Sequence, residues 1–260
     1  MKRTWMFAIV YGLVVFLAGC QTDQTPFSVK LPIQEDTTAV PPAARKAYRE
    51  DAARLTLRFM LRPGSPDSNT VELDEALMEK IYLGLLKIYL SAQTIPAADS
   101  VARMFAIHTF PNPPLNRLIV SLDTTVDWTG AWLKKQPLTG NSSVDSLVRR
   151  YQLSIVNVNV GPFVVPFVVV KSARFLNTIA LGRALASIPG VVFAGPDWAL
   201  GDGANIWLEV QASGLLFRFS VGWGDCPSGC IYRHVWKIFL DSNGRVAYLG
   251  STGPPLPTRR

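Results

Sequence analysis

The sequence lacks the residue patterns on which most enzyme families depend. It holds only two histidines, His108 and His234, and no G-x-S-x-G, H-E-x-x-H or P-loop pattern. Either histidine would need a serine in reach to form a hydrolase site, and no serine is marked out by its surroundings. We therefore predict no catalytic residue, no cofactor and no metal site, and an enzyme is the less favoured interpretation.

Charged residues are also few, at 17%, and no dense basic run is present. The formal net charge is +7, and removal of Lys2 and Arg3 with a leader would lower it to +5. Because the remaining basic residues are scattered, nucleic acid is not expected as a partner. Apolar residues make up 48% of the 260 residues, enough for one large core or two small ones.

The first twenty residues carry a targeting signal. Lys2 and Arg3 precede an apolar run over 5–16, which closes on Leu17-Ala18-Gly19-Cys20. A charged start, a short apolar core and small residues at the end predict a signal peptide over 1–19 rather than a spanning helix. The last four residues resemble the lipobox of bacterial lipoproteins. An ordinary signal peptide with a chance cysteine is the alternative.

The lipobox resemblance implies that Cys20 is acylated, with palmitate among the chains, and that the mature protein begins there. Several acyl chains anchor a protein almost irreversibly, since each buried CH₂ contributes about 0.8 kcal/mol. The polar, proline-interrupted residues 20–40 predict a flexible tether. Gln21 stands where inner-membrane lipoproteins of enteric bacteria often carry Asp, which favours the outer membrane of a bacterial cell envelope.

Residues 41–114 are predicted to be helical with one strand. A helix begins at Pro41-Pro42 and ends at the Pro-Gly turn over 62–66, and a second helix covers 74–92. Alternating apolar residues over 101–110 predict a strand that contains His108, for which a structural role is favoured.

Residues 115–198 give the clearest architectural pattern. In order, we expect a strand at 118–122, a helix at 144–151, strands at 155–160 and 163–170, a helix at 177–187 and a strand at 191–194. This order is the split βαβ pattern of a ferredoxin-like unit, with all its strands in one sheet. The wording of 184–197 is similar to the last helix and strand of subtilisin-type propeptides, a resemblance that implies fold rather than activity.

Residues 199–260 predict an antiparallel meander, with strands at 206–210, 215–221, 235–240 and 246–249. The predicted fold class is thus α+β, with N-terminal helices on a β-rich body. Segments 107–113 and 222–230 also look like lipoproteins of Bacteroidota, which brings no known activity with it.

One loop concentrates the unusual residues, between the second and third strands of the meander. With Cys20 set aside for lipid, Cys226 and Cys230 remain as a pair in a compartment that permits disulfides. A disulfide-clamped loop is favoured, flanked by Trp223 and Trp236 and presenting Asp225, Arg233 and His234. Asp225 is expected to bond within the loop or to pair with Arg233.

Two other interpretations of this loop stay open. A metal site would use Cys226, Cys230 and His234 but lacks a clear fourth ligand. Thiol–disulfide chemistry usually has two residues between the cysteines and a helix after them, whereas strands are predicted here.

These observations predict an envelope-anchored lipoprotein that is a non-enzymatic binding or structural module for a peptide, protein or envelope polymer. The expected partners are the membrane, through the lipid anchor, and a protein or peptide. The alternative is an enzyme, redox or metal protein centred on the Cys226-Cys230-His234 loop.

Overall fold

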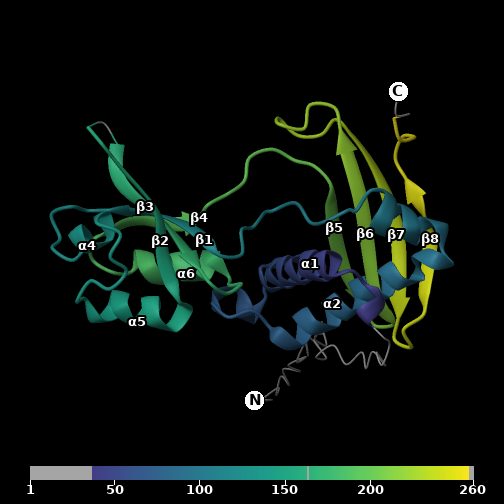
Figure 1. Ribbon diagram of the computed structural model, residues 1–260, viewed down its shortest axis with the longest axis horizontal. Helices are drawn as coiled ribbons and strands as arrows, with labels where there is room; N and C mark the ends of the chain where they lie inside the picture. The colour runs from purple at the N-terminus through teal and green to yellow at the C-terminus, as the bar shows by residue number, and fades with distance from the viewer. Residues whose placement is uncertain (1–36, 163, 258–260) are drawn as a thin grey trace, which may run out of the picture.

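The computed structural model describes residues 37–162 and 164–257. They form two lobes, each with a four-stranded antiparallel sheet covered by helices (Figure 1). The predicted α+β class is confirmed. The signal peptide, Cys20 and Gln21 lie outside the described residues, and Val40, at the end of the predicted tether, is fully buried in the larger core.

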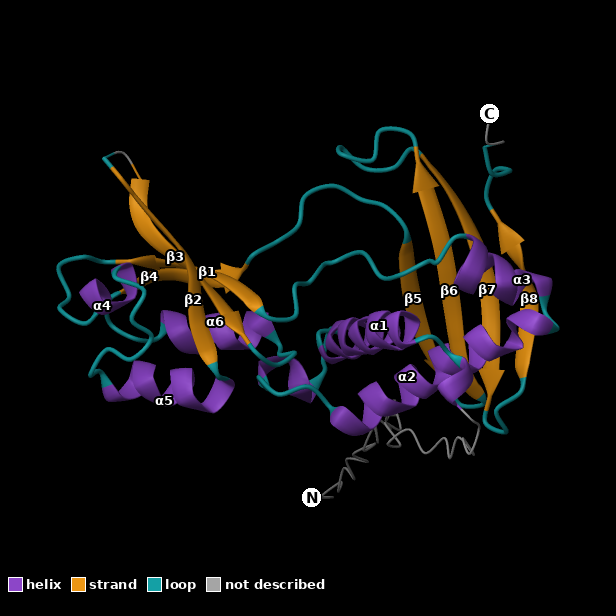
Figure 2. Ribbon diagram, viewed as in Figure 1, coloured by secondary structure: helices purple, strands orange, loops and turns teal. Residues whose placement is uncertain are grey.

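The larger lobe combines the two ends of the described chain. Its helices are α1 (Pro42–Met60) and α2 (Glu75–Leu90), which pack together on one face of the second sheet (Figure 2). Proline at the start of α1 and the Asp74 carboxylate, which accepts from the Leu77 N–H at 3.0 Å, set the two helix starts. Gly84 allows close packing, since a Cβ there would lie 3.1 Å from Leu240 and 3.2 Å from Phe217.

The predicted strand at 101–110 is wrong. The chain instead forms the short helix α3 (Pro96–Asp99), the π-helix η4 (Ser100–Met104) and an irregular segment. Val101 and Ala102 are buried, as is Ile107. Pro96 does not merely end the previous helix but opens a new one, because proline fits the first helical turn. Apolar alternation over so short a run does not exclude such a turn.

The smaller lobe has the predicted ferredoxin-like order. Its elements are β1 (Arg117–Leu122), α4 (Thr129–Leu133), α5 (Ser142–Tyr151), β2 (Leu153–Gly161), β3 (Val164–Ser172), α6 (Thr178–Ala186) and β4 (Val191–Pro196). The strand order β2-β3-β1-β4, antiparallel throughout, places all the predicted strands in one sheet. The short helix α4, which contains Trp132, lies between the predicted strand at 118–122 and the predicted helix at 144–151.

The second sheet is the predicted meander. Its strands β5 (Asn205–Gln211), β6 (Gly214–Trp223), β7 (Tyr232–Asp241) and β8 (Val246–Thr252) pair in chain order. Phe217 and Phe219 on β6 and Ile238 on β7 are buried in the core that includes α1 and α2. The helices of 41–114 and the strands of 199–257 therefore share one core.

Two irregular connections join the lobes, 105–116 leading into β1 and 197–204 leading into β5 (Figure 1). They are bonded to each other where Asn112 Nδ2 donates to the Ala199 carbonyl at 2.8 Å and Asn112 Oδ1 accepts from its N–H at 2.9 Å. Among the described residues, no helix is both long enough and apolar enough to cross a membrane.

Candidate functional site

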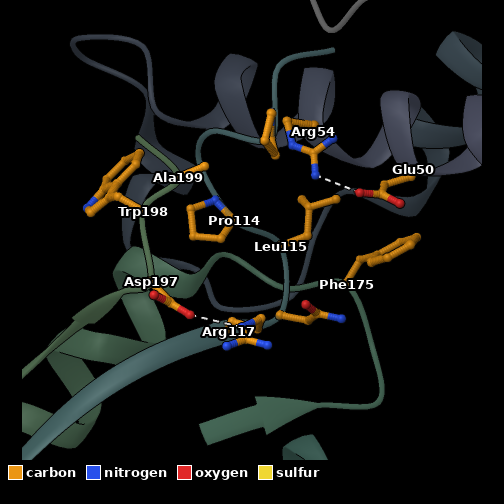
Figure 3. Close-up of a pocket in the computed structure, with 11 residues that line it drawn as sticks. Glu50, Arg54, Pro114, Leu115, Arg117, Phe175, Asp197, Trp198 and Ala199 are labelled. Carbon is orange, nitrogen blue, oxygen red and sulfur yellow. Dashed lines mark hydrogen bonds and ion pairs between the residues drawn. The ribbon is translucent and has the colours of Figure 1, made fainter. Parts of the chain in front are cut away.

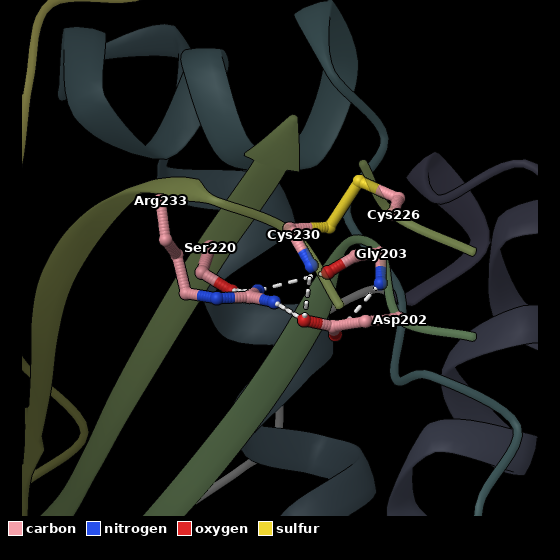
Figure 4. Close-up of a disulfide and its surroundings, with 6 residues drawn as sticks. All are labelled: Asp202, Gly203, Ser220, Cys226, Cys230 and Arg233. Carbon is pink, nitrogen blue, oxygen red and sulfur yellow. Dashed lines mark hydrogen bonds and ion pairs between the residues drawn. A yellow bond between two sulfur atoms is a disulfide. The ribbon is translucent and has the colours of Figure 1, made fainter. Parts of the chain in front are cut away.

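The cysteine loop is a structural clamp between β6 and β7. Cys226 and Cys230 form the predicted disulfide (Figure 4). Below the loop, Trp223 and Tyr232 are paired across the two strands, with stacked rings whose centroids lie 5.8 Å apart. Trp236 lies further along β7 and is buried, with its ring 5.6 Å from Phe105. The two tryptophans flank the loop as predicted.

Arg233 does not pair with Asp225. Its guanidinium donates to Asp202 Oδ2 at 2.5 Å, to Ser220 Oγ at 2.7 Å and to the Gly203 carbonyl at 2.8 Å. The side chain of Asp225 is exposed. The carboxylate that pairs with Arg233 is that of Asp202, which lies in the connection between the lobes. The expected pair is corrected because Arg233 points across the sheet end toward 202–203 (Figure 4).

Asp202 joins the connection to the disulfide loop. Its carboxylate also accepts from the Cys230 N–H at 3.3 Å, and its own N–H donates to the Cys226 carbonyl at 2.9 Å. Burial acts to raise the pKa of Asp202, but the bonds from Arg233, Gly203 and Cys230 outweigh it, so the pKa lies below its ordinary value. The loop thus fixes 202–203 to the second sheet.

His234 is directed away from Arg233. Successive residues of a strand point to opposite faces, and β7 carries both. His234 Nδ1 lies 2.9 Å from the Pro254 carbonyl oxygen, and its ring is 4.5 Å from that of Trp236. The predicted candidates Asp225, Arg233 and His234 are therefore not brought together. Within residues 37–162 and 164–257, no group of three His, Cys, Asp or Glu side chains could hold a metal ion.

A second polar cluster, which the sequence reasoning missed, ties α1 to the segment 108–113. The buried Asp51 carboxylate accepts from the Thr109 N–H and hydroxyl, each at 2.7 Å, and from His108 Nδ1 at 2.7 Å. Arg54 donates to Thr109 Oγ1 at 2.8 Å and to the Pro113 carbonyl at 3.3 Å. These charged residues provide hydrogen-bond partners for the backbone and side chains of a segment that lies in no helix or strand.

Arg58 extends the cluster along the connection 105–116 and to β5. It donates to the carbonyls of Phe110, Asn112 and Ile206 and to Asn205 Oδ1, at 2.7–3.1 Å. Burial, and then the neighbouring Arg54 cation, lower the pKa of Arg58 to about 10. The sequence does carry a signal for this cluster. The spacing of Asp51, Arg54 and Arg58 places three charged residues on one face of α1, beside apolar residues.

His108 has an orienting carboxylate, Asp51, and its ring lies 5.3 Å from that of Tyr48. An imidazole held by a buried carboxylate is half of a hydrolase arrangement. In the part of the chain that the structure describes, no serine or cysteine hydrogen-bonds to this ring. The pair therefore serves the attachment of 108–113 to α1.

A cavity of about 440 Å³ lies where the two lobes meet (Figure 3). On one side Arg54 pairs with Glu50, both from α1, at 2.8 Å. On the opposite side Arg117, the first residue of β1, pairs with Asp197 at 2.9 Å. Two guanidinium–carboxylate pairs thus form facing walls.

The apolar surface of the cavity lies between these pairs. Pro114 and Leu115 form its middle, with Trp198 on one side and Phe175 on the other (Figure 3). The Trp198 residue is 51% exposed although it is large and apolar. Exposed aromatic rings and guanidinium groups around a hollow are typical of binding sites rather than of a folded core.

The sequence reasoning missed this cavity because its walls come from four separate segments, and three of them are largely irregular. Comparison with protein-family models, with curated proteins and with solved structures gives no significant match.

Proposed function

We propose that the protein is an envelope lipoprotein, lipidated at Cys20, whose folded part binds a peptide segment of a partner protein without catalysing a reaction. The cavity between the lobes is the observation that carries the proposal. Its volume of about 440 Å³ lies inside the range of small-ligand sites, about 300–1,000 Å³. Its lining contains no histidine, serine or cysteine.

The lining favours a peptide over a sugar polymer. Arg and Trp supply much of the binding energy at protein interfaces, and both border this cavity. Apolar side chains of a peptide would contact Trp198, Leu115 and Phe175, while its polar groups would meet the guanidinium pairs. The bound segment would contact both lobes at once.

The lipobox at 17–20 supports the location. A lipidated Cys20 and Gln21 favour the outer membrane, where the cavity would be available to other envelope proteins.

The test uses the full-length protein in detergent micelles and an array of short peptides of defined sequence. Ala199→Phe should fill the cavity and weaken every specific interaction by about tenfold or more. The backbone bonds of Ala199 to Asn112 do not involve its side chain, so the fold should be retained. Trp198→Ala, which removes an exposed wall, provides a second variant.

Ala247→Phe is the matched control, because Ala247 is exposed on β8 and does not line the cavity. If no peptide binds, or if Ala199→Phe binds peptides as well as the control does, the cavity is not a peptide site. Circular dichroism melting of each variant separates loss of binding from loss of fold.

An enzyme, redox or metal protein centred on Cys226, Cys230 and His234 was the alternative. The divergence of Arg233 and His234 gives it no supporting geometry, and it is not proposed.

A further inference from the structure

We infer that the cavity recognises the C-terminal end of a peptide, through a carboxylate at Arg54 and an apolar side chain against Trp198 and Phe175. The inference rests on the proposed function and adds the chemistry of the ligand. It starts from the unusual position of Arg54, whose side chain is only 5% exposed yet borders the cavity.

Arg54 is held in place from behind. A guanidinium has five N–H groups, and those of Arg54 make one bond each to Pro113, Thr109 and Glu50. Thr109 in turn donates to the buried Asp51 carboxylate. The terminal nitrogens Nη1 and Nη2 therefore each retain a second N–H, and the group is fixed before a ligand arrives. Preorganised donors cost less ordering on binding.

Glu50 occupies the place that a ligand carboxylate would take. It is the carboxylate partner of Arg54, four residues earlier on the same helix, and its side chain is 50% exposed. Such i,i+4 pairs with a solvated member are weak, so Glu50 can turn to solvent at little cost. A ligand carboxylate in the cavity would meet the same guanidinium with more of its surroundings shielded from water.

Arg117 provides a second positive group on the facing wall. Its Nε donates to Asp197, and no bond from its Nη1 or Nη2 is present among the described residues. It adds donors for the last peptide carbonyl groups. The apolar middle of the cavity, between Trp198 and Phe175, is continuous with both arginines (Figure 3). A C-terminal residue carries a carboxylate and an apolar side chain on the same Cα, so it could meet both kinds of surface.

The experiment compares three probes by calorimetry on the full-length protein in micelles. They are N-acetyl-Ala-Pro-Phe with a free carboxylate, the same peptide as its C-terminal amide, and N-acetyl-Asp-Pro-Phe amide. The free acid should bind about tenfold or more tightly than either amide, since only it places a carboxylate beside the last side chain.

The substitution Glu50→Gln should strengthen binding of the free acid rather than weaken it. Removing the competing carboxylate should tighten binding of the free acid by about three- to tenfold and leave the amides unchanged. Because Glu50 is half exposed, the variant should fold normally. Glu79→Gln is the control, since Glu79 pairs with Arg49 away from the cavity.

Equal binding of acid and amide, still weakened by Ala199→Phe, would overturn the carboxylate inference while leaving the peptide site intact. Binding of the Asp-containing amide as tight as that of the acid would overturn the choice of the C-terminus. Binding of no probe, together with a negative peptide array, would overturn the proposed function itself.

Discussion

Replacing Arg58 by methionine should destabilise the protein strongly, because the side chain joins α1 to the connection 105–116 and to β5. The methionine side chain fills similar space but donates no hydrogen bond. Arg58 makes five bonds to four oxygen atoms. Two of those oxygens keep other donors, because Phe110 O accepts from the Asn112 N–H and Asn205 Oδ1 from the N–H groups of Phe110 and Ile206.

The size of this destabilisation follows from the two carbonyl oxygens that depend most on Arg58 for their hydrogen bonds. The Asn112 carbonyl loses both of its Arg58 bonds and the Ile206 carbonyl loses one. An unsatisfied buried group costs about 1–3 kcal/mol, so two of them give a loss of about 4 kcal/mol in the free energy of unfolding.

The assay is urea unfolding followed by circular dichroism, with Arg62→Met as the comparison. Arg62 donates one bond, to the Leu208 carbonyl at 3.0 Å, in an exposed position, and its loss should cost less than about 1 kcal/mol. A similar small loss for Arg58→Met would refute the reasoning, since it would mean that the connections hold without the guanidinium.

Four further predictions concern other parts of the chain. Cys20→Ala should leave the protein unlipidated and absent from the membrane fraction, and unchanged partitioning into the detergent phase would contradict the lipobox. Cys226→Ser should cost about 2 kcal/mol, the chain entropy of closing so short a loop, and leave secretion intact. A thiol count on the non-reduced, denatured wild type should find neither Cys226 nor Cys230 reactive, whereas two reactive thiols would exclude the bridge. The pKa of Asp202 is lowered in the folded state. The ionised carboxylate therefore stabilises the protein fully at pH values above its unfolded pKa of 3.8, and this stabilisation is lost as the pH falls through the folded pKa. Asp202→Asn should therefore reduce the dependence of the free energy of unfolding on pH in the acid range. An unchanged pH dependence would argue against the pair with Arg233.

The elements with strong periodicity could be predicted from the sequence. The β-branched runs that form β2 and β3, and the apolar stripe of α2, carry their own pattern and need no distant partner to be recognised. The disulfide followed from counting cysteines. The strand at 101–110 failed because Pro96 begins a helical turn, which a pattern of alternating apolar residues does not reveal.

The polar clusters could not be predicted because their partners lie far away in sequence. Asp202 is 31 residues from Arg233, and Asp51 is 58 residues from Thr109. Charged residues on a helix usually face solvent, and the sequence gives no sign that an irregular segment covers them. The need for these bonds arises only in the fold, where the segment 108–113, with Thr109 and Pro113 buried, lies in no sheet or helix that could bond its backbone.

The positions of these clusters argue that they keep the cavity in shape. Two of its walls, around 111–116 and 197–199, are irregular segments, which would need to be ordered before any ligand could bind there. Asp51, Arg54 and Arg58 fix the first segment to α1, and Asn112 fixes the second segment to the first. The second segment is held again, three residues further on, where Asp202 meets Arg233 and the disulfide loop. The unusual residues of the cysteine loop are thus explained as the far attachment of a cavity wall, a role that does not require Arg233 and His234 to converge.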